Sequence, residues 1–140
     1  MKIAVGSDHA GYELKQRLAQ ALQRQGHDVL DLGTHGTESV DYPDFAGAVA
    51  GAVRDGQAER GLLVCGTGIG MSIRANREPG VRAAKCNDPF EARMARAHND
   101  ANVLCLGARV VDASVAEELV ALFLATPFEG GRHALRIAKL

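Results

Sequence analysis

Short apolar segments alternate with segments of helical periodicity along the whole 140-residue sequence, and this alternation constrains the fold more than any other feature. Short apolar runs are typical of buried strands, whereas apolar residues at i, i+4, i+7 and i+8 predict an amphipathic helix. Strands that alternate with helices form a parallel sheet, because each helix carries the chain back to the edge where the previous strand began. We therefore expect an α/β protein with three layers, α/β/α, around a parallel sheet.

Five strands and six helices are expected from these patterns. The strands are predicted at residues 3–5, 27–32, 61–65, 81–85 and 103–106, and the helices at 11–25, 43–53, 71–76, 88–98, 115–126 and 132–139. Residues 33–42 are polar and are predicted to form a loop. No linker-like or low-complexity segment divides the chain, so we expect residues 1–140 to form a single domain.

Composition excludes several classes of protein. The net charge of -1 argues against broad electrostatic binding to nucleic acid or to an anionic membrane. No apolar run reaches the ~18 residues of a membrane span, and the first residues do not resemble a signal peptide, so we expect a cytoplasmic protein. Cys65, Cys86 and Cys105 are too few and too widely spaced for a disulfide framework or a zinc site.

A glycine-rich turn follows the third predicted strand. In parallel sheets ligands bind beyond the carboxyl ends of the strands, which is where this turn lies. Its N–H groups, with the start of the next helix, are suited to bind a phosphate or an enolate oxygen. Glycines chosen only for a tight turn remain the alternative. The turn consists of Gly66, Thr67, Gly68, Ile69 and Gly70.

Cys65 immediately precedes this turn and is a candidate base, because a nearby helix N-terminus favours a thiolate. A buried core cysteine is an equally good interpretation of its position. His9 follows the first strand, and His98 begins a polar cluster before the fifth strand. Histidine exchanges protons near neutral pH, although either residue could also be an ordinary surface histidine.

Three arginines are candidate phosphate ligands. Arg132 and Arg136 lie four residues apart, on one face of the terminal helix, and Arg109 follows the fifth strand. Guanidinium groups suit a phosphate monoester, but a basic helix end is also common without a ligand.

A dinucleotide-binding site is the second candidate for the function of the glycine-rich turn, with Asp88 as the ribose-binding acid. The turn, however, reads GxGxG rather than the GxGxxG of that motif.

Five separate motifs together resemble the type B ribose-5-phosphate isomerases, which group with the galactose-6-phosphate isomerase subunits. The resemblance runs from residue 1 to the end of the chain, and the motifs occur in the family's order. They are Gly6-Ser7-Asp8-His9-Ala10-Gly11, Asp41-Tyr42-Pro43, Cys65 to Gly70, His98 to Asn102, and Gly130-Gly131-Arg132-His133.

The resemblance implies a Rossmann-like fold with a five-stranded parallel sheet and an enzyme that interconverts ribose 5-phosphate and ribulose 5-phosphate. It implies a homodimer or tetramer with sites at the dimer interface, and no metal or cofactor. Cys65 would be the base, and His98 would assist ring opening. The turn would hold the enediolate oxygens at Gly66, Thr67, Gly68, Ile69 and Gly70. Sugar contacts would come from Asp8, His9, Tyr42 and Asn99, and phosphate contacts from Arg109, Arg132 and Arg136.

Two alternatives remain open at this stage. Galactose 6-phosphate or allose 6-phosphate could be the substrate, because the sequence does not determine the distance from the phosphate to C2. A nucleotide-binding module without catalytic activity is the other alternative.

One branch of the family places a glutamate after the glycine turn as the base. Met71 occupies that position here, so the sequence resembles the branch that uses a cysteine.

Overall fold

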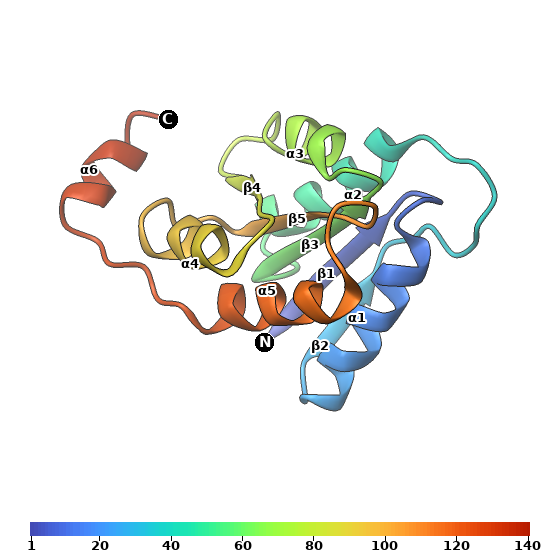
Figure 1. The fold of residues 1–140 in the computed structure, drawn as a ribbon. Coiled ribbons are helices and arrows are strands. Elements are labelled where there is room, and N and C mark those ends of the chain that lie inside the picture. The colour runs from blue at the N-terminus through green and yellow to red at the C-terminus, as the bar shows by residue number, and fades with distance from the viewer.

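The computed structural model describes residues 1–140 and contains one parallel sheet of five strands in the order β2-β1-β3-β5-β4 (Figure 1). This arrangement confirms the expected fold class. β5 lies between β3 and β4. The chain therefore forms β4 at the edge of the sheet first, and β5 is inserted between β3 and β4 afterwards in the sequence. The strands are β1 (Lys2–Ser7), β2 (Asp28–Asp31), β3 (Arg60–Cys65), β4 (Ala83–Lys85) and β5 (Val103–Gly107).

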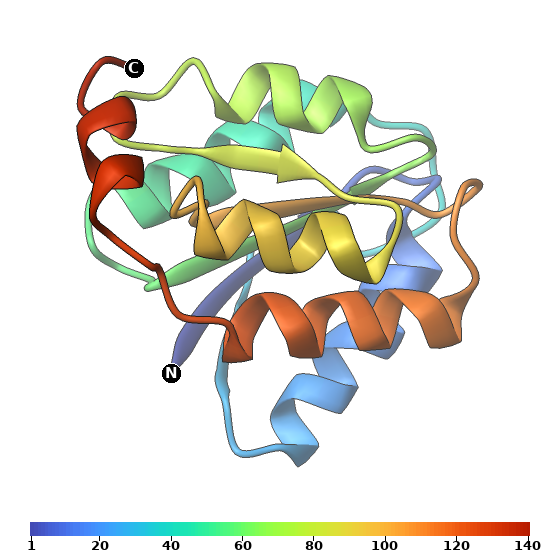
Figure 2. The same cartoon turned by 60° about the vertical axis from the view of Figure 1, so that its left-hand side comes forward.

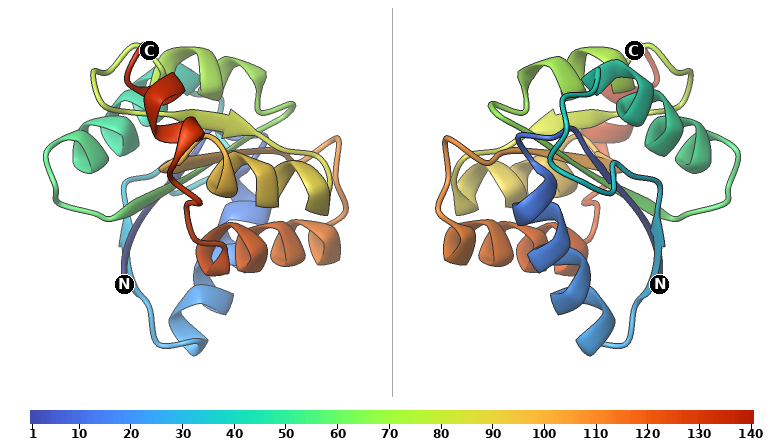
Figure 3. Two further views of the ribbon diagram at one scale, coloured as in Figure 1. Left: turned by 90° about the vertical axis from the view of Figure 1, so that its left-hand side faces the viewer. Right: turned by 90° about the vertical axis from the view of Figure 1, so that its right-hand side faces the viewer.

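Helices cover both faces of the sheet, as Figures 2 and 3 show. One face carries α2 (Tyr42–Arg54) and α3 (Ile69–Ala75), and the other carries α1 (Tyr12–Arg24), α4 (Pro89–Ala97) and α5 (Ala113–Ala125). The terminal helix α6 (Arg132–Ile137) lies beside the amino end of β4, away from the loops that follow β1 and β5 (Figure 2).

Two apolar clusters hold the layers together, because successive side chains of a strand point to opposite faces. In β1, Ile3 and Val5 join a cluster of 18 buried residues under α1, α4 and α5. Ala4 belongs to a cluster of 13 buried residues under α2 and α3. The central strands are therefore apolar on both faces, which explains why they appear in the sequence as continuous apolar runs.

The predicted elements all occur, with small shifts at their ends. The third helix begins at Ile69 rather than Met71, because Gly68 adopts a positive φ of 81° and ends the turn there. The fourth strand begins at Ala83 rather than Val81. No helix has the length and apolar character needed to cross a membrane.

A buried ion pair ties α1 to the loop after β2. The Lys15 side chain is fully buried, and its Nζ contacts the Asp31 carboxylate at 2.8 and 3.0 Å. The same Nζ donates to the Thr34 carbonyl oxygen at 2.7 Å. Asp31 also accepts the Gly33 N–H at 3.0 Å. These bonds satisfy the buried charge and anchor the start of the 33–41 loop, which lies next to the candidate site.

Candidate active site

The carboxyl ends of β1 and β3 lie side by side at the floor of a polar pocket. After β1 the chain forms β2 on one side of β1 and then β3 on the other side. At such a switch in strand order the loops after β1 and β3 run in opposite directions, which opens a crevice between them. The cavity measures about 460 Å³. Its lining residues are Asp8, His9, Ala10, Tyr42, Cys65, Gly66, Thr67, Ile69, Gly70, Ile73 and Arg109.

The Cys65 thiol ends β3 and reaches this pocket. Its Sγ accepts a hydrogen bond from the Gly68 N–H at 3.0 Å. That contact depends on the positive φ of Gly68, and a Cβ at this position would also lie 3.0 Å from the Leu106 carbonyl carbon. The glycine is therefore required both by the backbone conformation and by the close approach of β5.

Tyr42 and Arg109 close the sides of the turn. A Cβ at Gly70 would lie 2.3 Å from Cε1 of Tyr42, so only glycine lets this ring pack over the turn. Arg109 follows β5, and its Nη1 would lie 3.1 Å from a Cβ at Gly66. Two glycines thus allow an aromatic ring and a guanidinium group to approach the backbone beside Cys65.

Asp8 and His9 enter the pocket from the end of β1. Asp8 is buried, and its Oδ1 accepts the Gly11 N–H at 3.0 Å, which fixes the carboxylate against the start of α1. His9 Nδ1 accepts the Val40 N–H at 3.1 Å. In a neutral imidazole the proton then resides on Nε2, so His9 presents an N–H donor.

The other two cysteines differ from Cys65 in their surroundings. Burial, together with the nearby negative charges of Glu91 and Asp88, raises the pKa of the Cys86 thiol to about 12. Burial likewise raises the pKa of Cys105 well above its usual range. Neither thiol lines the pocket. They are therefore protonated core cysteines.

A second polar pocket lies at the opposite side of the sheet, where the strands have their amino ends. Its volume is about 270 Å³, and it is lined by His98, Asn99, His133, Arg136, Ile137 and Leu140. Arg132 is exposed on the same helix. The helix α4 runs antiparallel to the strands and returns the chain to their amino ends, and the five residues of β5 separate the two edges by roughly 13 Å.

The predicted site residues therefore form two groups within one chain. Asp8, His9, Tyr42, the turn from Cys65 to Gly70 and Arg109 lie at the carboxyl edge. His98, Asn99, Arg132 and Arg136 do not join them. The sequence contained a signal for this division, because His98 lies between a helix and the next strand, whereas Cys65 is the last residue of a strand.

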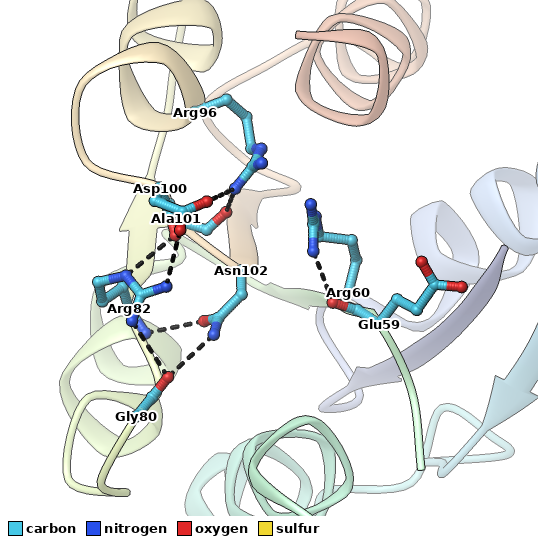
Figure 4. A network of polar contacts seen from close by, with 8 residues as sticks. All are labelled: Glu59, Arg60, Gly80, Arg82, Arg96, Asp100, Ala101 and Asn102. Atoms are coloured by element: carbon cyan, nitrogen blue, oxygen red, sulfur yellow. Dashed lines mark hydrogen bonds and ion pairs between the residues drawn. The ribbon is translucent and has the colours of Figure 1, made fainter. Parts of the chain in front are cut away.

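Asp100, which follows His98 and Asn99 in the chain, is bonded to Arg82 and Arg96, as Figure 4 shows. Its carboxylate contacts Arg96 Nη1 at 2.8 Å and Arg82 Nη2 at 3.4 Å. Its carbonyl oxygen accepts the Arg82 Nε–H at 3.0 Å. Asp100 also adopts a positive φ of 45°, a conformation that few residues other than glycine tolerate. The turn is thus fixed by charge as well as by backbone geometry.

His98 and His133 stack face to face in the second pocket. Their ring centroids are 4.2 Å apart and their planes differ by 11°. Glu129 Oε1 lies 3.6 Å from His98 Nε2 and 4.0 Å from His133 Nε2. Burial, followed by the positive charge of His98 and Arg132, lowers the pKa of His133, while Glu129 opposes this shift. No pattern in the sequence singled out Glu129.

These three residues are close enough to suggest a metal site, but their orientation does not fit one. A zinc ion lies about 2.0–2.1 Å from a histidine nitrogen, along the lone pair in the plane of the ring. Two nearly parallel stacked rings direct their lone pairs side by side rather than toward one point. One ring would have to turn before an ion could bind both nitrogens.

Asp88 does not fit the role of a ribose-binding acid. Its carboxylate accepts the Glu91 N–H at 2.8 Å and caps the start of α4. It follows β4 at the edge of the sheet, and β5 separates β4 from the glycine turn after β3. The residue that motivated the dinucleotide alternative is therefore a helix cap outside the pocket.

The fold and the pocket together define a Rossmann-like α/β protein with a site for a small polar ligand at the switch point of its sheet. The model of the Ribose/Galactose Isomerase family matches residues 3–140, and the chain belongs to this family. It is thus an isomerase.

Solved structures and characterised relatives agree with this assignment. The structure of ribose-5-phosphate isomerase B from Clostridium thermocellum is 55% identical, with a TM-score of 0.99 over 99% of this chain and 94% of that chain. Ribose-5-phosphate isomerase B of Escherichia coli is 46% identical over 136 residues, 97% of this chain and 91% of the relative. D-Erythrulose-4-phosphate isomerase of Pectobacterium atrosepticum is 43% identical over 141 residues, 100% of this chain and 93% of the relative.

Proposed function

We propose that the chain interconverts D-ribose 5-phosphate and D-ribulose 5-phosphate through an enediolate. The observation that carries this proposal is the Cys65 thiol, whose sulfur accepts the Gly68 N–H at 3.0 Å and faces a polar pocket. An aldose–ketose isomerase needs a base that removes a weakly acidic C–H proton and returns it to the neighbouring carbon. The name and 46% identity of the Escherichia coli relative support the choice of substrate.

In this mechanism Cys65 moves the proton between C1 and C2. The N–H groups of the turn from Gly66 to Gly70 hold the enediolate oxygens, and each such donor is worth roughly 10²–10³ in rate. Within the turn, the Gly68 N–H is bonded to Sγ and the Ile69 N–H to Thr67 Oγ1 at 3.2 Å. The enediolate is therefore held by the remaining N–H groups of the turn.

The other residues bind and open the sugar. Asp8, His9, Tyr42 and Asn99 contact the hydroxyl groups, and His98 transfers a proton during opening of the furanose ring. Arg109, Arg132 and Arg136 bind the phosphate, because guanidinium groups form charge-assisted hydrogen bonds with its oxygens. Binding energy from the phosphate then positions C1 and C2 against Cys65.

This mechanism requires two copies of the chain. His98 and Arg136 lie at the opposite edge of the sheet from Cys65, too far to act on the same small substrate. A two-fold symmetric dimer brings the Cys65 pocket of one copy against the His98 pocket of the other, and its symmetry forms two identical sites.

Exposed apolar side chains beside both pockets support such a dimer. Ile69 and Ile73, one turn apart on α3, are 52% and 58% exposed and line the Cys65 pocket. Leu135 on α6 is 73% exposed. Burying these side chains between two copies would remove them from water, which is favourable by about 25 cal/mol per Å² of apolar surface.

The test is an isomerase assay across sugar phosphates of four, five and six carbons. We expect the highest kcat/KM for ribose 5-phosphate, compared with D-erythrulose 4-phosphate, galactose 6-phosphate and allose 6-phosphate. A higher value for a six-carbon or four-carbon substrate would reassign the function within the family. Stabilisation by NAD without any isomerase activity would instead support a nucleotide-binding module.

A further inference from the structure

Glu129 occupies a specific position in the second pocket although it precedes α6 in an irregular segment. Its backbone N–H donates to the Ala97 carbonyl oxygen at 3.0 Å, which anchors it beside the last residue of α4. Its Oε1 lies 3.6 Å from His98 Nε2 and 4.0 Å from His133 Nε2. One carboxylate oxygen therefore faces the Nε2 atom of each of the two stacked rings.

We propose that Glu129 is a positioning residue for His98, acting with His133 as a ring support. The proposal rests on the proposed function, in which His98 assists ring opening. An ionised carboxylate only accepts hydrogen bonds, so it favours the proton on Nε2 of His98 and leaves Nδ1 to face the substrate. At 3.6 Å the contact is electrostatic rather than a hydrogen bond.

The proton balance of ring opening shows what Glu129 contributes. His98 Nδ1 takes the proton of the anomeric hydroxyl, the C1–O1 bond becomes a carbonyl, and the bond from C1 to the ring oxygen breaks. The imidazolium of His98 then returns the proton to the departing ring oxygen. In between, His98 carries a positive charge, and the carboxylate stabilises that charge as the acidic member of a catalytic triad does.

His133 fits this role because burial lowers its pKa and so favours the neutral ring. A protonated ring stacked on His98 would repel the imidazolium, but burial disfavours a charge on His133. The side chain of His133 is 8% exposed, compared with 38% for His98. The buried His133 ring fixes the plane of the His98 ring by stacking on it. The His98 ring is partly exposed, so a substrate can reach its outer side.

Glu129 also precedes the arginines proposed for the phosphate, and this predicts the direction of its effect on binding. Arg132 and Arg136 follow it at the start and near the end of α6. A negative charge beside them opposes binding of an anionic phosphate. Removal of the charge should therefore leave KM unchanged or lower it, whereas disordering of the segment would raise KM.

The variants Glu129→Gln and Glu129→Asp test the proposal in the full-length protein. For Glu129→Gln we expect kcat with ribose 5-phosphate to fall by at least about ten-fold, since a positioned histidine contributes 10²–10⁴ as general acid and base. KM should not rise. Exchange of the C1 proton of ribulose 5-phosphate in deuterated water should be nearly unchanged, because this ketose cannot close to a furanose. Glu129→Asp should recover part of the lost turnover.

Two further measurements separate this proposal from the proposed function. The ¹⁵N resonances of His98 should show the proton on Nε2 in the unaltered protein and a loss of this preference in Glu129→Gln. Glu118→Gln, an exposed change on α5, is the matched control and should alter neither reading. If the unaltered protein isomerises ribose 5-phosphate but Glu129→Gln retains its kcat, or if proton exchange falls in parallel, the positioning role is wrong. If the unaltered protein lacks the activity, the proposed function fails instead.

Discussion

Three cysteines in one small chain have different chemical environments, and these differences come from single contacts. Burial raises the pKa of Cys86 and of Cys105, whereas Cys65 ends a strand at a pocket and its sulfur accepts a backbone N–H. The sequence alone left two interpretations of Cys65 equally open, a base or a core cysteine. Because it is only 6% exposed yet lines the pocket, Cys65 combines a dry environment with access to a ligand.

Replacing Cys65 tests its role directly. Cys65→Ala should reduce kcat by about 10²–10⁴-fold, the usual contribution of a proton-transferring side chain. Affinity for ribose 5-phosphate, measured by calorimetry, should change little because the thiol is not a phosphate ligand. Cys86→Ala is the control and should lower thermal stability more than turnover. Retention of normal turnover in Cys65→Ala would place the base elsewhere.

The guanidinium group of Arg136 is proposed to bind the phosphate, so a single substitution tests this role. Arg136→Ala should raise KM for ribose 5-phosphate by about 10- to 100-fold, the value of a lost hydrogen bond to a charged group. Turnover of a sugar without phosphate should change less. Arg93→Ala, an exposed arginine on α4, serves as the control. Equal proportional effects on both substrates would contradict a phosphate role.

At the scale of elements, α6 depends on a single buried histidine for its contact with the rest of the chain. His133 is the one buried residue of this helix, and it rests on His98 at the end of α4. Leu135 and Arg136 project outward from the same short helix. Docking of α6 within one chain therefore rests on a titratable side chain rather than on a large apolar surface.

This arrangement predicts a pH dependence of stability. The pKa of His133 is lowered from 6.5 by burial, so the unfolded chain binds the proton more readily than the folded chain. The stabilising contribution is complete above pH 6.5 and is lost as the pH falls below that value. Melting temperatures measured from pH 8 to pH 5 should show this decline. It should be smaller in His133→Asn and unchanged in His35→Asn, and an identical decline in all three proteins would assign it to other groups.

At the scale of the whole molecule, the two groups of proposed site residues lie at opposite ends of the strands, so the proposed mechanism would require a dimer. Each copy would contribute the base to one site and the ring-opening histidine to the other. The arrangement follows from the direction of α4, which returns the chain to the amino edge before β5 begins. The terminal helix α6 lies at the same end of the strands (Figure 2), and its Arg136 lines the pocket that contains His98.

Mixed dimers test this arrangement. Cys65→Ala and His98→Asn should each be nearly inactive in the aldose direction. After the two are unfolded together and refolded in equal amounts, activity should recover to about a quarter of the normal value, because half of the random dimers are mixed and each contains one intact site. A mixture that stays inactive although mixed dimers form would show that each site lies within one chain.

The local pattern of the sequence was sufficient to predict the elements and one half of the candidate site. Strands and helices depend on residues close in the sequence, so the apolar run from Gly61 to Cys65 and the turn that follows it could be recognised without a structure. Cys65 ends a strand, Asp8 and Arg109 come just after strands, and the carboxyl ends of parallel strands lie at the same side of the sheet. Their association was therefore predictable.

Only the tertiary structure decided where the other half lies and what supports it. Strand order depends on packing between distant segments, so no spacing in the sequence placed β5 between β3 and β4. His98 and Arg136 were grouped with Cys65 by their chemistry, but α4 carries His98, and α5 with the segment after it carries Arg136, to the amino ends of the strands. Glu129 and His133 meet His98 only because two segments that are distant in the sequence, the end of α4 and residues 129–133, pack together there. Sequence patterns record which residues share an element, whereas contacts between elements are determined by how the layers pack.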